Sequence, residues 1–261
     1  MGVVLVVEVP VGEAIRGALV PQFAFDREHA MALVAIFGTT ISPYLFFWQA
    51  GQEVEEQHRR HVKPLHLSHR TAGAELKRIR TDTLVGMGFS HLVALFIVIA
   101  TAATLHASGV RDIESAAQAA EALRPIAGEF AFALFAIGII GTGLLAVPIL
   151  AGSAAYAVSE AFGWTEGLDR KPREAKAFYG AIVVAVLGGL ALNFAAIDPM
   201  KALYWAAVVN GLLAPPLMVV TMLIARNRRV MGNLAISGWL EAGGWLATTV
   251  MFTVAGIFLF A

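Results

Sequence analysis

The chain contains six apolar runs, each close to the length that a helix needs to cross a bilayer. A hydrocarbon layer of about 30 Å is crossed by about 20 helical residues at 1.5 Å per residue. Hydrophobic residues make up 58% of the sequence and the mean hydropathy is +0.71, which exceeds what an ordinary soluble domain contains. The sequence therefore predicts six transmembrane helices, at 30–50, 82–106, 128–152, 177–197, 202–225 and 238–260, of which the third can continue to Phe162.

Long uninterrupted runs favour an all-α polytopic membrane protein, because the strands of a transmembrane barrel alternate in hydropathy over short segments. The lipid bilayer is then the first partner of the chain. Residues 30–261 form the membrane domain, and 1–29 form an N-terminal stub with an extracellular connection. Cysteine is absent, so no disulfide or thiolate metal site is possible. No nucleotide-binding motif is present, and we expect neither a nucleic-acid partner nor a cofactor.

The distribution of Lys and Arg predicts the orientation, because these residues accumulate on the cytoplasmic side. The segments 51–81, 163–176 and 226–237 carry seven, four and three of them, whereas all segments on the other side together carry five. The first span thus enters from outside, and the N- and C-termini both lie outside. The expected location is an integral position in a bacterial inner membrane.

The first apolar run is interrupted at residues 38–43, Gly-Thr-Thr-Ile-Ser-Pro. Pro43 lacks an amide hydrogen, so the carbonyl of Thr39 loses its usual helical partner. Non-helical backbone at membrane depth is tolerated where protein buries it or where it lines a watery cavity, and transporters hold ions at such breaks. The interruption is therefore a candidate site, and a simple proline kink is the alternative.

A few other polar residues lie within the spans, where they usually face a bundle interior or a water path. His91 is a candidate proton relay, or else a neutral histidine bonded to a neighbouring helix. Asn210, ahead of Pro215 and Pro216, is a candidate for a second unwound segment. Gln49 is a candidate for the cytoplasmic vestibule, with helix–helix hydrogen bonding as the alternative. The acidic and histidine residues of segment 53–69 are interpreted as a solvated loop, because Arg and Lys lie among them, and a metal-collecting site is the alternative.

Three segments of the sequence resemble helices of the NRAMP-type divalent metal transporters. The run Ile36–Ala50, followed by Gln52–Glu56, resembles their sixth transmembrane helix. Asp82–Met87 and Phe130–Phe162, the latter including Gly-Thr-Gly-Leu-Leu-Ala-Val-Pro, resemble the seventh and eighth. The similarity covers the whole chain but only the second half of the family architecture, and it is closest to a divergent bacterial branch related to magnesium transporters. The apolar stub Met1–Val9 then corresponds to the end of a preceding helix; a short N-terminus on the membrane surface is the alternative.

The resemblance implies a LeuT-type fold of two inverted repeats, with the ion held at the broken first and sixth helices. In the family the sixth-helix break reads Gly-Ala-Thr-Val-Met-Pro-His. This alignment implies that Thr39 contributes a metal-binding carbonyl and that Ser42 replaces the usual methionine ligand. Tyr44 replaces the histidine, and Thr40 and Pro43 lie on the same path. Replacing the methionine sulfur with a serine oxygen favours hard ions such as Mg²⁺ and Mn²⁺.

The resemblance implies a secondary transporter that brings divalent metal ions of the Mg, Mn and Fe class into the cytoplasm by alternating access, with proton coupling left open. The metal ion is the substrate. The first five helices, with their Asp and Asn ligands, are absent, so another chain or a longer protein would have to supply them. Two alternatives remain: a membrane interaction subunit or truncated remnant without transport, and an intramembrane enzyme. The spans contain no paired carboxylates or zinc-binding motif, so we do not expect an enzyme.

Overall fold

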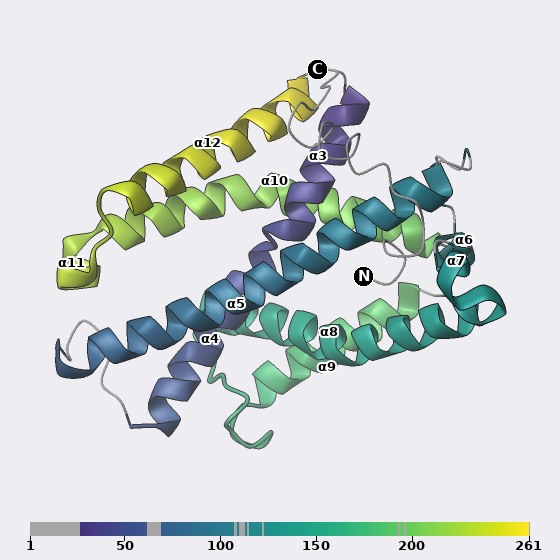
Figure 1. The fold of residues 1–261 in the computed structure, drawn as a ribbon. Helices are drawn as coiled ribbons and strands as arrows, with labels where there is room; N and C mark the ends of the chain where they lie inside the picture. Colours follow the sequence, from purple (N-terminus) through teal and green to yellow (C-terminus); the bar gives the residue numbers. More distant parts are fainter. Residues whose placement is uncertain are drawn as a thin grey trace. The chain divides into compact units, whose positions relative to one another are not determined.

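The structure is a computed structural model, and it describes residues 27–61, 69–106, 109, 113, 115–121, 123–192, 194–195 and 197–260. All regular elements among these residues are helical (Figure 1). The predicted all-α class is thus confirmed for this part of the chain. Most of the expected N-terminal stub, 1–29, lies outside the described residues.

The helices follow the apolar runs in order. The long ones are α3 (Arg27–Thr40), α4 (Pro43–Arg59), α5 (His69–Thr101), α8 (Ala131–Phe162), α9 (Lys176–Leu192), α10 (Pro199–Arg226) and α12 (Trp239–Phe260). A π-helical turn, η2 (Ala102–His106), extends α5. The short elements are α6 (Ala116–Glu121), α7 (Arg124–Ala127), η3 (Gly128–Phe130), α11 (Arg228–Met231) and η4 (Gly232–Leu234).

Five of the six expected spans are long apolar helices in the described part of the chain, with α3 and α4 together forming the first. The third continues to Phe162. The fourth, expected at 177–197, differs because α9 ends at Leu192 and has 17 residues. At 1.5 Å per residue it is about 26 Å long, a little less than the hydrocarbon layer. The prediction of six full-length spans is therefore not confirmed.

The chain divides into two compact units. One contains Leu76–Leu144, and therefore most of α5 and the first part of α8. The other contains Phe25–Glu75 and Leu145–Ala261, and therefore α3, α4, the second part of α8, and α9 to α12. All candidate residues except His91 belong to this second unit, which we call the break unit.

The break unit has two apolar clusters. In the first, side chains of α3, α10 and α12 pack around Val34, Val208 and Phe258. In the second, Tyr156 of α8 packs on Phe178 of α9, with ring centroids 4.9 Å apart, and Trp48 of α4 lies against the same tyrosine. The two clusters fix α3 and α4 to different neighbours, on either side of the interruption in the first span.

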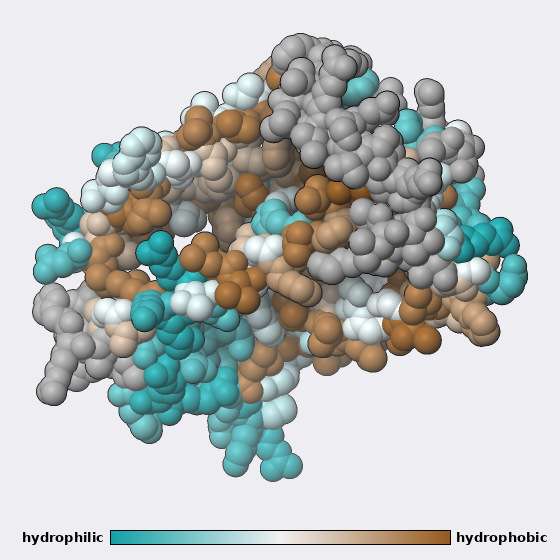
Figure 2. All heavy atoms as spheres, viewed as in Figure 1, coloured by the Kyte–Doolittle hydropathy of each residue, from teal (hydrophilic) through white to brown (hydrophobic). Residues whose placement is uncertain are grey.

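Large apolar side chains cover much of the helical surface. Phe89, Leu144 and Leu203 are examples, each more than 60% exposed. Figure 2 shows hydrophobic residues along the helices and hydrophilic residues gathered where α4 ends and where α8 joins α9. Exposed apolar surface on this scale is unsuited to water and suits the hydrocarbon of a membrane.

Candidate functional site

The predicted interruption of the first span is present. Helix α3 ends at Thr40 and α4 begins at Pro43, which leaves Ile41 and Ser42 outside helical structure. Ser42 has extended dihedral angles, φ −81° and ψ 113°, as expected for the residue before a proline. Pro43 takes the first position of α4, where a backbone N–H would make no hydrogen bond within the helix, so a proline costs nothing there. Local sequence therefore accounts for the break.

The Ser42 hydroxyl lies against the carbonyl groups at the end of α3. Its Oγ donates to the carbonyl oxygen of Thr39 at 3.0 Å and lies 3.2 Å from that of Gly38. The serine thus supplies, through its side chain, the donor that Pro43 lacks. A carbonyl oxygen has two lone pairs, so this contact leaves the Thr39 carbonyl able to bind a cation. Ser42 is itself buried, with 3% of its surface exposed.

The two threonines of the break use their hydroxyls locally. Thr39 Oγ1 donates to the carbonyl of Ala35 at 2.9 Å, and Thr40 Oγ1 to that of Ile36 at 2.7 Å. Each hydroxyl thus bonds to the carbonyl group of the residue four positions earlier, one helical turn back. The Thr39 side chain is therefore committed to α3, and only the backbone carbonyl of this residue is offered at the break.

A cavity of about 550 Å³ lies within the break unit, beside the start of α4. Its polar side chains are Tyr44 of α4, Ser153 of α8 and Asn210 of α10, and Pro43 also lines it. The remaining wall is apolar: Phe47, Leu150, Ala154, Ala157, Leu213, Pro216, Leu217 and Val220. The structure thus brings Pro43, Tyr44 and Asn210 together, although Asn210 is far from the other two in the sequence.

Two glycines allow α3 and α10 to cross at van der Waals distance. A Cβ atom on Gly38 would overlap the carbonyl oxygen of Ala207 and lie 2.8 Å from the Cα of Gly211. A Cβ on Gly211 would overlap the carbonyl oxygen of Val34 and lie 2.7 Å from its Cγ1. Small residues permit such crossings in membranes. The crossing places Asn210, the neighbour of Gly211, close to the end of α3.

The family model for natural resistance-associated macrophage protein-like proteins matches residues 1–261, which is the entire sequence. The chain belongs to the Nramp family.

The curated relatives of this Nramp chain are described as the divalent metal cation transporter MntH. That of Bradyrhizobium diazoefficiens is 26% identical over 247 residues, covering 93% of this chain and 52% of the relative. That of Deinococcus radiodurans is 24% identical over 255 residues, covering 94% and 52%. The Nramp chain therefore spans about half the length of the curated relatives it matches. As a member of this family with helices able to span a bilayer, it is an integral membrane protein.

Two other predicted residues of this Nramp chain, Gln49 and His91, do not line the cavity. Gln49 is exposed and does not line the cavity. His91 lies in the other unit, exposed on α5, where its Nδ1 is 2.6 Å from the Met87 carbonyl oxygen. A carbonyl only accepts, so Nδ1 must carry the hydrogen, which leaves Nε2 available to a proton. The partner is on its own helix, not on the neighbouring one that the alternative interpretation required.

The expected unwinding at Asn210 is wrong, because α10 is helical without interruption from Pro199 to Arg226. Pro215 and Pro216 remove two amide donors, but a proline also holds φ near the helical value. Pro215 is buried within the helix, and the crossing with α3 supports the backbone nearby. Asn210 thus reaches the cavity from a regular helix.

A second polar group of this Nramp chain was not found by sequence reasoning. Glu55, interpreted as part of a solvated loop, is instead buried within α4, which continues to Arg59. Its carboxylate accepts hydrogen bonds from the Tyr156 hydroxyl, from the Leu168 N–H at 2.7 Å and from the Asp169 N–H at 3.2 Å. We call this arrangement the Glu55 clasp. It ties the last turns of α4 to α8 and to the segment between α8 and α9.

The signal for Glu55 was present but ambiguous. Helix periodicity places Trp48, Glu55 and Arg59 near one face of α4, yet the segment contains four other charged or amide residues that are at least partly exposed: Gln52, Glu53, Glu56 and Gln57. Nothing in their spacing distinguishes the one that meets the backbone amides of 168 and 169. Ser153 was missed for a similar reason, because a single serine in an apolar run has no periodic signature.

Glu166 lies beside the Glu55 clasp, and the pKa of its carboxyl is raised above its ordinary value by burial, and further by the carboxylates of Glu160 and Glu55. Its Oε2 is buried and has no hydrogen-bond partner. A raised pKa in the folded state means that this group favours folding at low pH, and that the contribution is lost as the pH rises through the folded pKa.

Replacing Glu166 with glutamine is therefore expected to stabilise the chain at neutral pH, by about 0.5 kcal/mol, the scale of a single partly solvated substitution. The gain should disappear below the ordinary pKa of a glutamate, because the native carboxyl is then protonated in both states. Thermal unfolding of purified chain at several pH values measures this. Glu129→Gln, at a side chain that is 92% exposed, is the control. A gain that did not depend on pH would contradict the assignment.

Proposed function

We propose that this chain is the second half of a secondary transporter that carries divalent metal ions into the cytoplasm by alternating access. The observation that carries the proposal is the break at Ile41 and Ser42, where the Thr39 carbonyl and the Ser42 hydroxyl form an oxygen-only group at the end of α3. Family membership supports the same function, because the curated relatives are described as divalent metal cation transporters.

The proposed metal site is incomplete within the described residues, where no group of three or more His, Asp or Glu side chains is placed to hold a metal ion. We propose that carboxylate and amide ligands come from a first repeat of five helices in a LeuT-type arrangement, supplied by a longer protein or a separate chain. The Ser42 and Thr39 oxygens then complete the shell. The cavity lined by Tyr44, Ser153 and Asn210 is the proposed inner path.

We propose a preference for hard ions of the Mg²⁺ and Mn²⁺ type, because hydroxyl and carbonyl oxygens suit them better than they suit Cd²⁺. The positive-inside pattern supports entry from outside, across a bacterial inner membrane. His91, with Nε2 available, remains the proposed proton relay.

The direct test is uptake of ⁵⁴Mn²⁺ and of Mg²⁺ into proteoliposomes that contain this chain together with a first repeat, either in one reading frame or as a co-expressed chain. We expect uptake only when both halves are present. Vesicles with neither half give the background. Equal accumulation with and without the first repeat would contradict the proposed division of the site, and the absence of uptake from the complete assembly would contradict transport.

Ser42→Met is expected to shift selectivity toward soft ions, raising the ratio of Cd²⁺ to Mg²⁺ uptake about tenfold, which corresponds to about 1.4 kcal/mol of differential binding. The methionine also removes the hydroxyl that donates to the Thr39 carbonyl. Ser42→Ala separates the two effects, because it removes the hydroxyl without adding sulfur. Ile36→Met is the control, because it places the same side chain at an exposed position of α3 before the break. Unchanged discrimination in Ser42→Met would count against the ligand assignment.

A further inference from the structure

A second cavity, of about 450 Å³, lies between the end of α10 and the beginning of α12. Its side chains come from one short stretch of sequence, and they include Arg226, Arg228, Asn233, Ser237 and Glu241. The proposed transport path does not use any of them. Pockets of this size accommodate small molecules or polar headgroups.

The walls of this pocket are held in place by hydrogen bonds within the loop. The Ile236 N–H donates to the Ala225 carbonyl at 3.0 Å, which joins the two ends of the loop. The Asn227 side chain accepts from the Arg229 N–H at 2.9 Å, which fixes the start of α11. Gly232 has a positive φ of 57°, which a residue with a Cβ adopts less readily. The pocket is therefore preformed by the backbone of 225–236.

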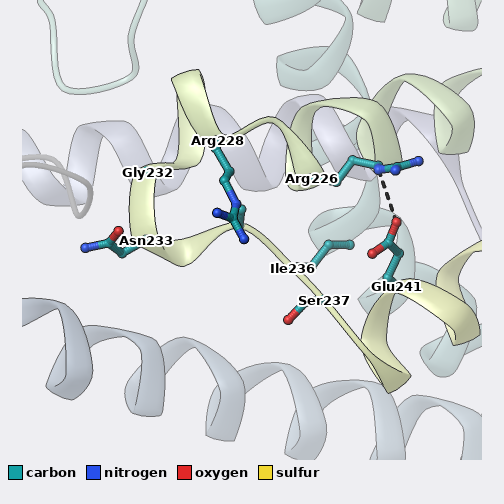
Figure 3. A pocket seen from close by; sticks show the side chains of 8 residues that line it. Arg226, Arg228, Gly232, Asn233, Ile236, Ser237 and Glu241 are labelled. Atoms are coloured by element: carbon teal, nitrogen blue, oxygen red, sulfur yellow. Dashed lines mark ion pairs between the residues drawn. The ribbon is translucent and has the colours of Figure 1, made fainter.

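The charge of the pocket is positive. Arg226 Nε lies 3.1 Å from Glu241 Oε1, so this carboxylate is matched by one guanidinium. Figure 3 shows Arg228 extending from the start of α11 toward the segment with Ile236 and Ser237, while the Arg226–Glu241 pair lies to one side. Arg228 thus adds a second guanidinium to the same cavity. A planar guanidinium binds a phosphate through two parallel N–H donors.

The position of the pocket relative to the bilayer follows from the helices that flank it. Arg226 ends one candidate span and Trp239 begins the next, so the loop lies at the membrane surface. Trp239 is 94% exposed and Leu240 is 74% exposed. An exposed tryptophan at the end of a span is typical of the interface between headgroups and hydrocarbon. The pocket therefore lies at the depth of lipid headgroups.

We propose that this pocket, which we call the Arg228 pocket, binds a phosphate group, with the headgroup of an anionic phospholipid as its source in the membrane and free phosphate as the other possible source. Basic pockets between the ends of transmembrane helices recognise anionic headgroups in this way. Arg228 contacts the phosphate and Ser237 offers a hydroxyl donor, whereas Arg226, which is turned toward Glu241 to one side of Arg228 (Figure 3), contributes only its charge. Glu241 opposes binding through its charge while it positions Arg226.

The test is native mass spectrometry of the detergent-solubilised full chain with phosphatidylglycerol, phosphatidylcholine or inorganic phosphate. We expect phosphatidylglycerol to bind more tightly than phosphatidylcholine. Arg228→Gln should weaken its binding about fivefold, the effect of one basic side chain at a headgroup. Arg229→Gln is the matched control, because Arg229 is adjacent but does not line the pocket. Glu241→Gln should strengthen binding, since it removes the opposing charge.

Each outcome distinguishes the possibilities. If millimolar inorganic phosphate binds with the same Arg228 dependence and phosphatidylglycerol binds no better than phosphatidylcholine, the source of the phosphate is soluble. If Arg228→Gln and Arg229→Gln weaken binding equally, or if neither probe binds, the proposal is overturned. Arg228→Lys keeps the charge but loses the paired donors, and we expect intermediate affinity. The melting temperature of each variant, measured without lipid, reports whether it remains folded.

Discussion

Gly211→Ala is expected to destabilise the break unit by about 1–3 kcal/mol, the usual effect of forcing extra atoms into a filled site. The new methyl group would meet the backbone of Val34, whose carbonyl oxygen and Cγ1 lie within the space that a Cβ occupies. Because the obstacle is backbone and not the end of a flexible side chain, α3 and α10 would have to move apart. Thermal unfolding of the purified chain in detergent measures the loss.

Gly243→Ala is the matched control for this substitution. Gly243 lies within α12, where a Cβ would meet nothing within 4 Å. Alanine favours a helix over glycine by up to about 1 kcal/mol, so this variant should be neutral or more stable. Two variants that unfold at the same temperature would contradict the close crossing of α3 and α10. If the chain transports metal ions as proposed, Gly211→Ala should also reduce uptake by the two halves together, because the crossing positions Asn210 beside the break.

Glu55→Ala is expected to cost about 2–3 kcal/mol, because it removes the acceptor of the Tyr156 hydroxyl and of the Asp169 N–H, and leaves the Leu168 N–H with only its longer contact to the Tyr156 hydroxyl at 3.4 Å. The Tyr156 hydroxyl also accepts from Gln52 Nε2 at 3.2 Å, so the loss would extend to a fourth group. Thermal unfolding is again the measurement. Proteolysis of the segment between α8 and α9 should accelerate in parallel, since the clasp is what ties this segment to α4.

Glu56→Ala is the control for the Glu55 clasp. Its carboxylate is 44% exposed and pairs with Arg60 at 3.8 Å, an arrangement that contributes little. We expect a change within about 0.5 kcal/mol. Glu55→Gln tests the role of charge separately, because its amide oxygen still accepts while its amide nitrogen cannot. If Glu55→Ala were as stable as Glu56→Ala, the Glu55 clasp would not hold the segment between α8 and α9.

The sequence by itself determined the fold class and the position of the break. Long apolar runs require helices, since a bilayer leaves no other partner for the backbone of a continuous apolar segment. Pro43 removes a donor at a defined residue and forces Ser42 out of the helical region. These effects act between residues a few positions apart, so they can be predicted without knowing what packs against them.

The tertiary structure alone decided which distant residues meet. Asn210 reaches the cavity at the start of α4 because Gly38 and Gly211 let two helices cross, a contact between positions 173 residues apart. Glu55 is buried because the segment at 168 and 169 presents two amides to it. The pattern of α4 does not distinguish Glu55 from Glu53 or Glu56. Burial of a single charge depends on the partner that meets it, and that partner comes from packing rather than from local sequence.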